Sequence, residues 1–166
     1  PQFLTRSLFF STSILTITFQ KSVFSRKIKE STPLSFSNCY SNSEIQSKVQ
    51  SCTQNICTFT QSSEKIQLSC SLELQYSGDF KARIKKFLTK RMPKVTTLYI
   101  LIDKDGSSGN VFISYRTQQT TGFGIDINAQ FIPTVERENI DFNEHTICSW
   151  NQFLLANIGR LLRFYY

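Results

Sequence analysis

The most constraining feature of this sequence is the strict alternation of apolar and polar side chains between Ile66 and Tyr76. Ile, Leu, Cys or Tyr occupies every even position of this run, and Gln, Ser or Glu occupies every odd position. Successive side chains of a β-strand point to opposite faces, so the alternation predicts a strand with one buried face and one solvated face. The chain must then fold around a sheet that is covered on one side.

Further strands are expected on both sides of this run. Leu98–Ile102 is continuously apolar, as is typical of a central strand, and the charges at Arg26, Lys27 and Lys29 suit an edge strand. The other expected strands are residues 8–10 and 14–19, residues 23–29 paired with 14–19 across a turn at 20–22, residues 111–115 and residues 124–132.

Two helices are predicted by apolar spacing of three and four residues. The first has Asp79 as its N-cap, runs to about Arg91 before Pro93, and carries an apolar stripe of Phe80, Ile84, Phe87 and Leu88. The second begins near Asn143, and its stripe consists of Ile147, Trp150, Leu154, Ile158, Leu161 and Tyr165. Gly159 costs helix stability and predicts close packing at that position.

These elements define an α+β fold in which a mixed or antiparallel sheet carries two helices on one face. We expect strands in residues 1–30, a Ser/Asn/Gln-rich surface connection in 31–63 with a short strand near 56–60, and the main α+β domain in 64–166. The chain begins at Pro1 without an initiator Met and ends on apolar residues, so we expect it to be a piece of a longer protein.

The formal net charge is +7, which suits an anionic partner such as nucleic acid or an acidic protein. The first helix concentrates this charge on a cationic face formed by Lys81, Arg83, Lys85, Lys86, Lys90 and Arg91. Two interpretations stay open, an anion-binding face and a solvated face that keeps the chain soluble.

The five cysteines have irregular spacing, and the sequence contains a single His. This pattern supports neither a zinc site nor a disulfide framework, so we expect free thiols and no metal. The loop at 103–110 lacks the ligand set of a calcium loop. His145 has no evident partners for nucleophilic catalysis, so self-contained catalysis is not expected. No apolar run is long enough to span a bilayer, and we expect an intracellular, cytoplasmic chain without a membrane partner.

Residues 116–142 contain the most suggestive site. A polar, glycine-containing loop at 116–123 leads into the strand expected at 124–132, and the charged cluster Glu136-Arg137-Glu138 follows Pro133. Polar loops at both ends of one strand are where a site is expected.

Three motifs in this part of the chain resemble one protein family. They are Gln-Gln-Thr-Thr-Gly at 118–122, Phe-Ile-Pro-Thr-Val-Glu-Arg-Glu-Asn-Ile-Asp at 131–141, and the pair Trp150-Asn151. Together they resemble sacsin-related fungal proteins that carry an ATPase domain of the histidine-kinase and heat-shock-chaperone type, the GHKL superfamily.

The resemblance implies that this chain is the transducer-like second domain of such a protein, with a ribosomal-protein-type fold. Its expected partner is an upstream ATPase domain of the same parent chain, and further protein partners are expected. ATP and Mg²⁺ would be cofactors of the parent only, because this chain lacks the motifs that hold them.

On this interpretation Arg137 would sense the γ-phosphate, which requires positive charge and hydrogen-bond donors around it. Gln118 and Gln119 would donate amide hydrogen bonds. Supporting roles fall to Glu136 and Glu138, which would orient Arg137 by ion pairing, and to Gly122 and Gly124, which would let the loop bend.

Two alternatives remain for the whole chain and one for Arg137. The chain could be a basic binding module for nucleic acid or an acidic protein, or a folded remnant of a truncated gene. Arg137 could simply form salt bridges with Asp126, Asp141 or its neighbouring glutamates.

Overall fold

The computed structural model describes residues 16–19, 22–59, 64–87, 92–102 and 109–166. Seven strands, β2 to β8, form a mostly antiparallel sheet, and β1 extends it by pairing with β2, in the order β1-β2-β3-β4-β5-β8-β6-β7. Only the β6–β8 pair is parallel among the described strands. The strands are β1 (Thr16–Phe19), β2 (Ser22–Pro33), β3 (Ile45–Phe59), β4 (Glu64–Tyr76), β5 (Val95–Ile102), β6 (Asn110–Phe112), β7 (Arg116–Thr120) and β8 (Ile125–Asn128).

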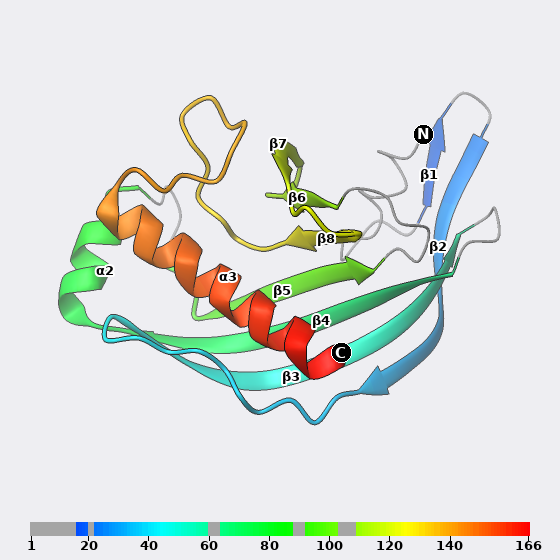
Figure 1. Cartoon of the computed structure of the whole chain (residues 1–166), viewed down its shortest axis with the longest axis horizontal. Coiled ribbons are helices and arrows are strands. Elements are labelled where there is room, and N and C mark those ends of the chain that lie inside the picture. Colours follow the sequence, from blue (N-terminus) through cyan, green and yellow to red (C-terminus); the bar gives the residue numbers. More distant parts are fainter. Residues whose placement is uncertain (1–15, 20–21, 60–63, 88–91, 103–108) are drawn as a thin grey trace.

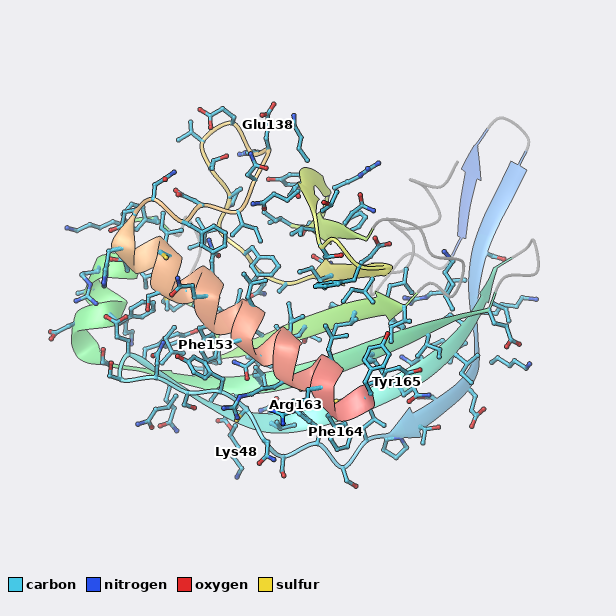
Figure 2. The ribbon with its side chains drawn as sticks, in the orientation of Figure 1. Lys48, Glu138, Phe153, Arg163, Phe164 and Tyr165 are labelled. Atoms are coloured by element: carbon cyan, nitrogen blue, oxygen red, sulfur yellow. The ribbon has the colours of Figure 1, made fainter. Side chains whose placement is uncertain are left out.

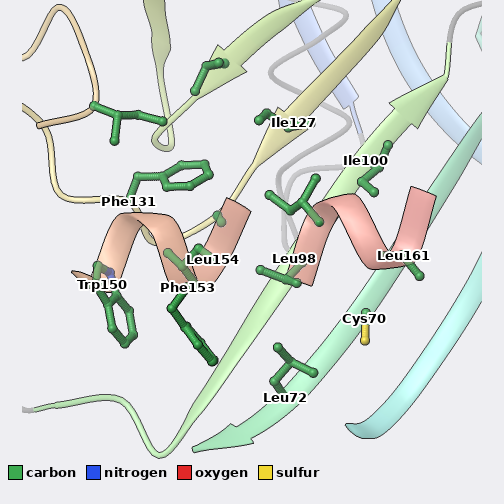
Figure 3. Packing of buried hydrophobic residues seen from close by; sticks show 14 of the residues in the cluster. Cys70, Leu72, Leu98, Ile100, Ile127, Phe131, Trp150, Phe153, Leu154 and Leu161 are labelled. Atoms are coloured by element: carbon green, nitrogen blue, oxygen red, sulfur yellow. The ribbon is translucent and has the colours of Figure 1, made fainter. Parts of the chain in front are cut away.

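Helix α3 (His145–Tyr165) lies across one face of this sheet (Figure 1). Figure 3 shows Trp150, Phe153 and Leu154 among the side chains that fill the space between helix and strands. Burying a large apolar side chain contributes about 1.5–3 kcal/mol, so this face supplies much of the stability of the fold. The shorter helix α2 (Gly78–Ile84) adds Phe80 and Ile84 to the same apolar cluster.

Strand β4 confirms the alternation from which its position was predicted. Leu68, Cys70 and Leu72 are fully buried on the face covered by α3, whereas Glu73 is exposed on the other face. Gln67 departs from the pattern, because it is buried although it lies on the face expected to be solvated. It pairs in register with Leu101 of β5, which is also buried. The sheet together with helices α2 and α3 confirms the coarse α+β prediction.

The connection expected at 31–63 is confirmed only at 34–44, and the short strand expected near 56–60 is the end of a longer strand, so the prediction is wrong at 31–33 and 45–55. Strand β2 continues to Pro33, and β3 is a 15-residue strand between β2 and β4. The polar composition is accommodated by polar pairs across the strands, since Thr53 shares a hydrogen bond of 2.7 Å with Ser69 and Asn55 donates to Gln67. Such pairs can stabilise a sheet even where one of the two strands has a mainly polar sequence.

The first helix is shorter than predicted and begins earlier. Ser77 is its N-cap in place of Asp79, and its hydroxyl accepts a hydrogen bond from the amide of Phe80. The helix ends at Ile84, so Phe87 is not part of the apolar stripe and is 40% exposed. Residues 88–91 of the predicted helix lie outside the described residues.

Helix α3 confirms the predicted apolar stripe, with Ile147, Trp150, Leu154, Ile158 and Leu161 buried and Tyr165 partly buried. The expectation about Gly159 is wrong. A Cβ atom added at Gly159 would have no neighbouring atom within 4 Å, because the helix faces open space there.

The strands near the expected site also have bounds that differ from the predicted ones. The polar segment after Arg116 is the strand β7, while β8 ends at Asn128 and β6 ends at Phe112. Beyond β8 the chain leaves the sheet, yet Phe131 and Ile132 stay buried in the core cluster. The apolar pattern at 124–132 therefore reflects burial without strand pairing at its end.

Candidate functional site

Residues 132–141 fold back on themselves, and we call this segment the 132–141 hairpin. Pro133 and Ile140 form a β-bridge, the amide of Asp141 donates to the carbonyl of Ile132, and the amide of Thr134 donates to the carbonyl of Asn139. Figure 2 shows Glu138 near the outer end of this segment, away from the sheet. The Glu136-Arg137-Glu138 cluster therefore occupies the tip of the hairpin.

Asn151 of α3 holds the two arms of the hairpin together. Its Oδ1 accepts from the amide of Ile132 at 2.9 Å, and its Nδ2 donates to the carbonyls of Ile132 and Asp141 at 2.8 and 2.7 Å. Its neighbour Trp150 donates from Nε1 to the carbonyl of Gln130 at 2.8 Å. The Trp-Asn pair thus fixes the base of the hairpin, a role that sequence analysis missed, although an Asn on the buried side of a helix was the available signal.

Strand β7 supports the hairpin from the other side. The amide of Gln118 donates to the carbonyl of Glu138 at 2.8 Å, and the Oε1 atom of Gln119 accepts from the amide of Ile140 at 2.8 Å. The structure thus brings Gln118, Gln119 and the charged cluster together. The side chain of Gln119, however, is engaged in holding the hairpin, whereas the side chain of Gln118 is exposed.

Arg137 is exposed at the tip and has a left-handed backbone, with φ of 61°. Among the residues that the structure describes it forms no salt bridge. The expected salt-bridge partners are engaged elsewhere, since Asp126 accepts from Asn110 and Asp141 accepts from the amide of Asn143. The ion pairing expected with Glu136 and Glu138 is likewise not formed, so the guanidinium faces solvent.

The turn between β7 and β8 contains the two glycines singled out from the sequence. Gly122 has φ of 75°, a conformation that other residues rarely adopt, and Gly124 directly precedes β8. The turn places the side chain of Phe123 outward, where it is 68% exposed.

The cationic face predicted for the first helix is only partly free of ion pairs, and Lys85 and Lys86 lie beyond the end of α2. Lys81, Lys85 and Lys86 are exposed, but Arg83 forms a salt bridge with Glu44. Glu44 also accepts a hydrogen bond of 2.6 Å from the hydroxyl of Ser149, which ties the β2–β3 connection to both helices. Lys90 and Arg91 lie outside the described residues.

All five cysteines are free thiols, as expected. Burial raises the pKa of the Cys57 thiol, and a hydrogen bond with Cys52, together with burial, raises the pKa of Cys70. The same hydrogen bond lowers the pKa of Cys52. No group of three metal-binding side chains occurs within the described part of the chain. Nor do the described residues include a helix with the length and apolar character needed to cross a membrane.

One family model matches this chain, over residues 102–166, which is less than half of its length. That family is described as a protein of unknown function (DUF3684). The matched part contains β6, β7, β8, the 132–141 hairpin and α3. Comparison with curated proteins gave no match, and comparison with solved structures gave none either.

Proposed function

We propose that this chain is the domain that senses or transmits nucleotide state in a chaperone-like protein of the GHKL ATPase type. The observation that carries the proposal is the exposed position of Arg137 at the tip of the hairpin. Its guanidinium is exposed and has no ion pair with a described residue, at the tip of a hairpin whose base is fixed by Asn151 and Gln119.

A guanidinium in this position can act only on a group supplied by another domain or molecule. Phosphoryl transfer is accelerated by positive charge placed near the γ-phosphate, and an arginine supplied by a second domain is a recurrent source of that charge. A fixed base matters because a misplaced guanidinium stabilises the transition state poorly. Gln118, with its exposed side chain, is the second group that could donate to the phosphate.

The test uses a longer protein that contains this chain and the proposed upstream ATPase domain. Replacing Arg137 with Ala should lower ATP turnover by at least about tenfold while changing the affinity for ATP by less than about twofold, because a group that acts in the transition state affects turnover more than binding. Turnover is measured as phosphate release, and affinity is measured by equilibrium titration with ATP.

Two buried asparagines of α3 provide a matched control. Asn151 holds the hairpin, whereas Asn157 accepts from the amide of Tyr40 at 2.7 Å and donates to its carbonyl, so it holds the β2–β3 connection. Asn151→Leu should lower turnover and Asn157→Leu should not, although both should destabilise the fold. Equal effects of the two substitutions on turnover, or unchanged turnover in Arg137→Ala, would contradict the proposal.

A second function is favoured by the exposed side chains of Lys81, Lys85 and Lys86, which form no salt bridge with any described residue. We propose as an alternative that this face binds nucleic acid or an acidic protein. Binding to a DNA or RNA oligonucleotide should weaken steeply with salt and after charge reversal at Lys85 and Lys86. Salt-independent binding, or none, would exclude nucleic acid as the ligand of this face.

A further inference from the structure

An apolar groove of about 370 Å³ lies between α3 and the β7–β8 turn. Thirteen residues line it, nine of them apolar and none of them charged. Glu136, Arg137 and Glu138 are not among them, whereas Gln119 and Ile140, which join β7 to the hairpin, are. The groove thus lies beside the base of the hairpin, and binding there would not involve the exposed Arg137 side chain.

One wall is the outward side of the C-terminal half of α3. Leu155, Gly159 and Leu162 follow one another at spacings of four and three, so they share one face of the helix. Gly159 leaves this wall hollow at its middle, because no atom lies within 4 Å of the position a Cβ would take. The glycine, which has no packing role in the described structure, thereby enlarges the groove.

The opposite wall comes from the end of β7 and the turn after it, and it contains no charged residue either. Thr120 and Phe123 lie there, and Phe142 lies on the segment that follows the hairpin. Phe123 and Phe142 are 68% and 39% exposed, so two aromatic side chains of the lining remain accessible from solvent.

Two lining side chains, Gln119 and Thr120, offer a hydrogen-bond donor, and the donor of Gln119 is held in a fixed orientation. The Oε1 atom of Gln119 accepts from the amide of Ile140, which fixes the orientation of the side-chain amide. Its Nε2 forms no hydrogen bond with a described residue, whereas the hydroxyl of Thr121 is already within hydrogen-bond distance of the carbonyls of Phe123 and Ile125. Gln119 thus combines a structural role with a donor available to a ligand.

We propose that this groove binds a small, neutral and mainly apolar ligand, an aliphatic chain or an aromatic ring that carries an uncharged hydrogen-bond acceptor. The volume lies in the range of about 300–1,000 Å³ that is typical of small-molecule sites, and such sites combine apolar walls with few polar groups. A charged ligand would lose hydration without gaining an ion pair, since no lining residue is charged.

The test uses the 166-residue chain and the neutral dye N-phenyl-1-naphthylamine, whose fluorescence rises in apolar surroundings. Binding should saturate at one site per chain, and 1-decanol should displace the dye at a concentration at least about tenfold lower than decanoate, because only the carboxylate pays for lost hydration. Equal displacement by the alcohol and the carboxylate would overturn the proposed ligand class.

Substitutions on the two walls locate the site. Gly159→Trp and Thr120→Trp should each weaken dye binding by at least about tenfold, because each indole would fill the groove from its own side. Gly159→Ala should retain binding, and circular dichroism should show that all three variants are folded. If one Trp variant fails to fold, the other still decides the result.

Three further outcomes would overturn the proposal. The first is a native chain that does not bind the dye saturably. The second is binding that survives both Trp substitutions but is lost in Phe164→Ala, which alters a separate pocket next to Phe36 at the end of α3. The third is a dimer, seen by analytical ultracentrifugation and dissociated by Gly159→Trp, because a second copy of the chain would then occupy the groove.

Discussion

The two halves of α3 face their surroundings in contrasting ways. In the N-terminal half, Asn151 holds the 132–141 hairpin through three side-chain hydrogen bonds, and Trp150 forms a fourth with Gln130 in the chain that leaves β8. In the C-terminal half, Leu155, Gly159 and Leu162 face a groove. One helix thus provides a rigid support at one end and an unfilled surface at the other, although the same apolar stripe packs both halves onto the sheet.

The largest effect on stability is expected from removing the hydrogen bonds of Asn151 in the N-terminal half of α3. Asn151→Leu keeps the side-chain volume but leaves the buried amide of Ile132 and the partly buried carbonyl of Asp141 without their hydrogen-bond partner. Each such group costs about 1–3 kcal/mol, so the free energy of unfolding should fall by about 3 kcal/mol. Urea denaturation measures this change.

The exposed neighbour Gln152 provides the control for that experiment. Gln152→Ala should change the free energy of unfolding by less than about 0.5 kcal/mol, as is usual for surface substitutions. A loss in Asn151→Leu no larger than the change in Gln152→Ala would show that the hairpin is held by other contacts.

A smaller effect of opposite sign is expected in the other half of the helix. Gly159→Ala should raise the free energy of unfolding by about 0.5–1 kcal/mol, because Ala favours the helix and its Cβ meets no atom. Thermal melting followed by circular dichroism measures the gain. Destabilisation would mean that Gly159 is closely packed after all.

The smallest effect is expected at the tip of the hairpin. In Arg137→Gly, relief of the left-handed backbone and the greater flexibility of the unfolded chain act in opposite directions, so the free energy of unfolding should change by less than about 1 kcal/mol. The same urea titration tests this. A large loss would show that the Arg137 side chain is structural, which would weaken its proposed role toward phosphate.

The contrast also bears on how the site could be recognised from the sequence. Arg137 and the Trp-Asn pair were identifiable as motifs, but the contacts that connect them join residues up to 20 positions apart. The groove had no counterpart in sequence analysis, since Gly159 was interpreted as a closely packed residue. A glycine within a helix indicates missing side-chain volume without telling whether a neighbour fills the space.

The sequence by itself determined β4 and α3, whose periodicity records burial on one side, and β5, whose continuously apolar run records burial in the middle of the sheet. The periodicity arises because a solvated face and a buried face impose a repeat of two or of about 3.6 residues, whatever the partner is. Only the tertiary structure decided that the polar segment 45–55 is a strand, because the side chains of Thr53 and Asn55 form hydrogen bonds with Ser69 and Gln67 of β4. The hairpin likewise depends on Asn151 and the groove on what lies opposite Gly159, and such contacts between distant residues leave no local pattern.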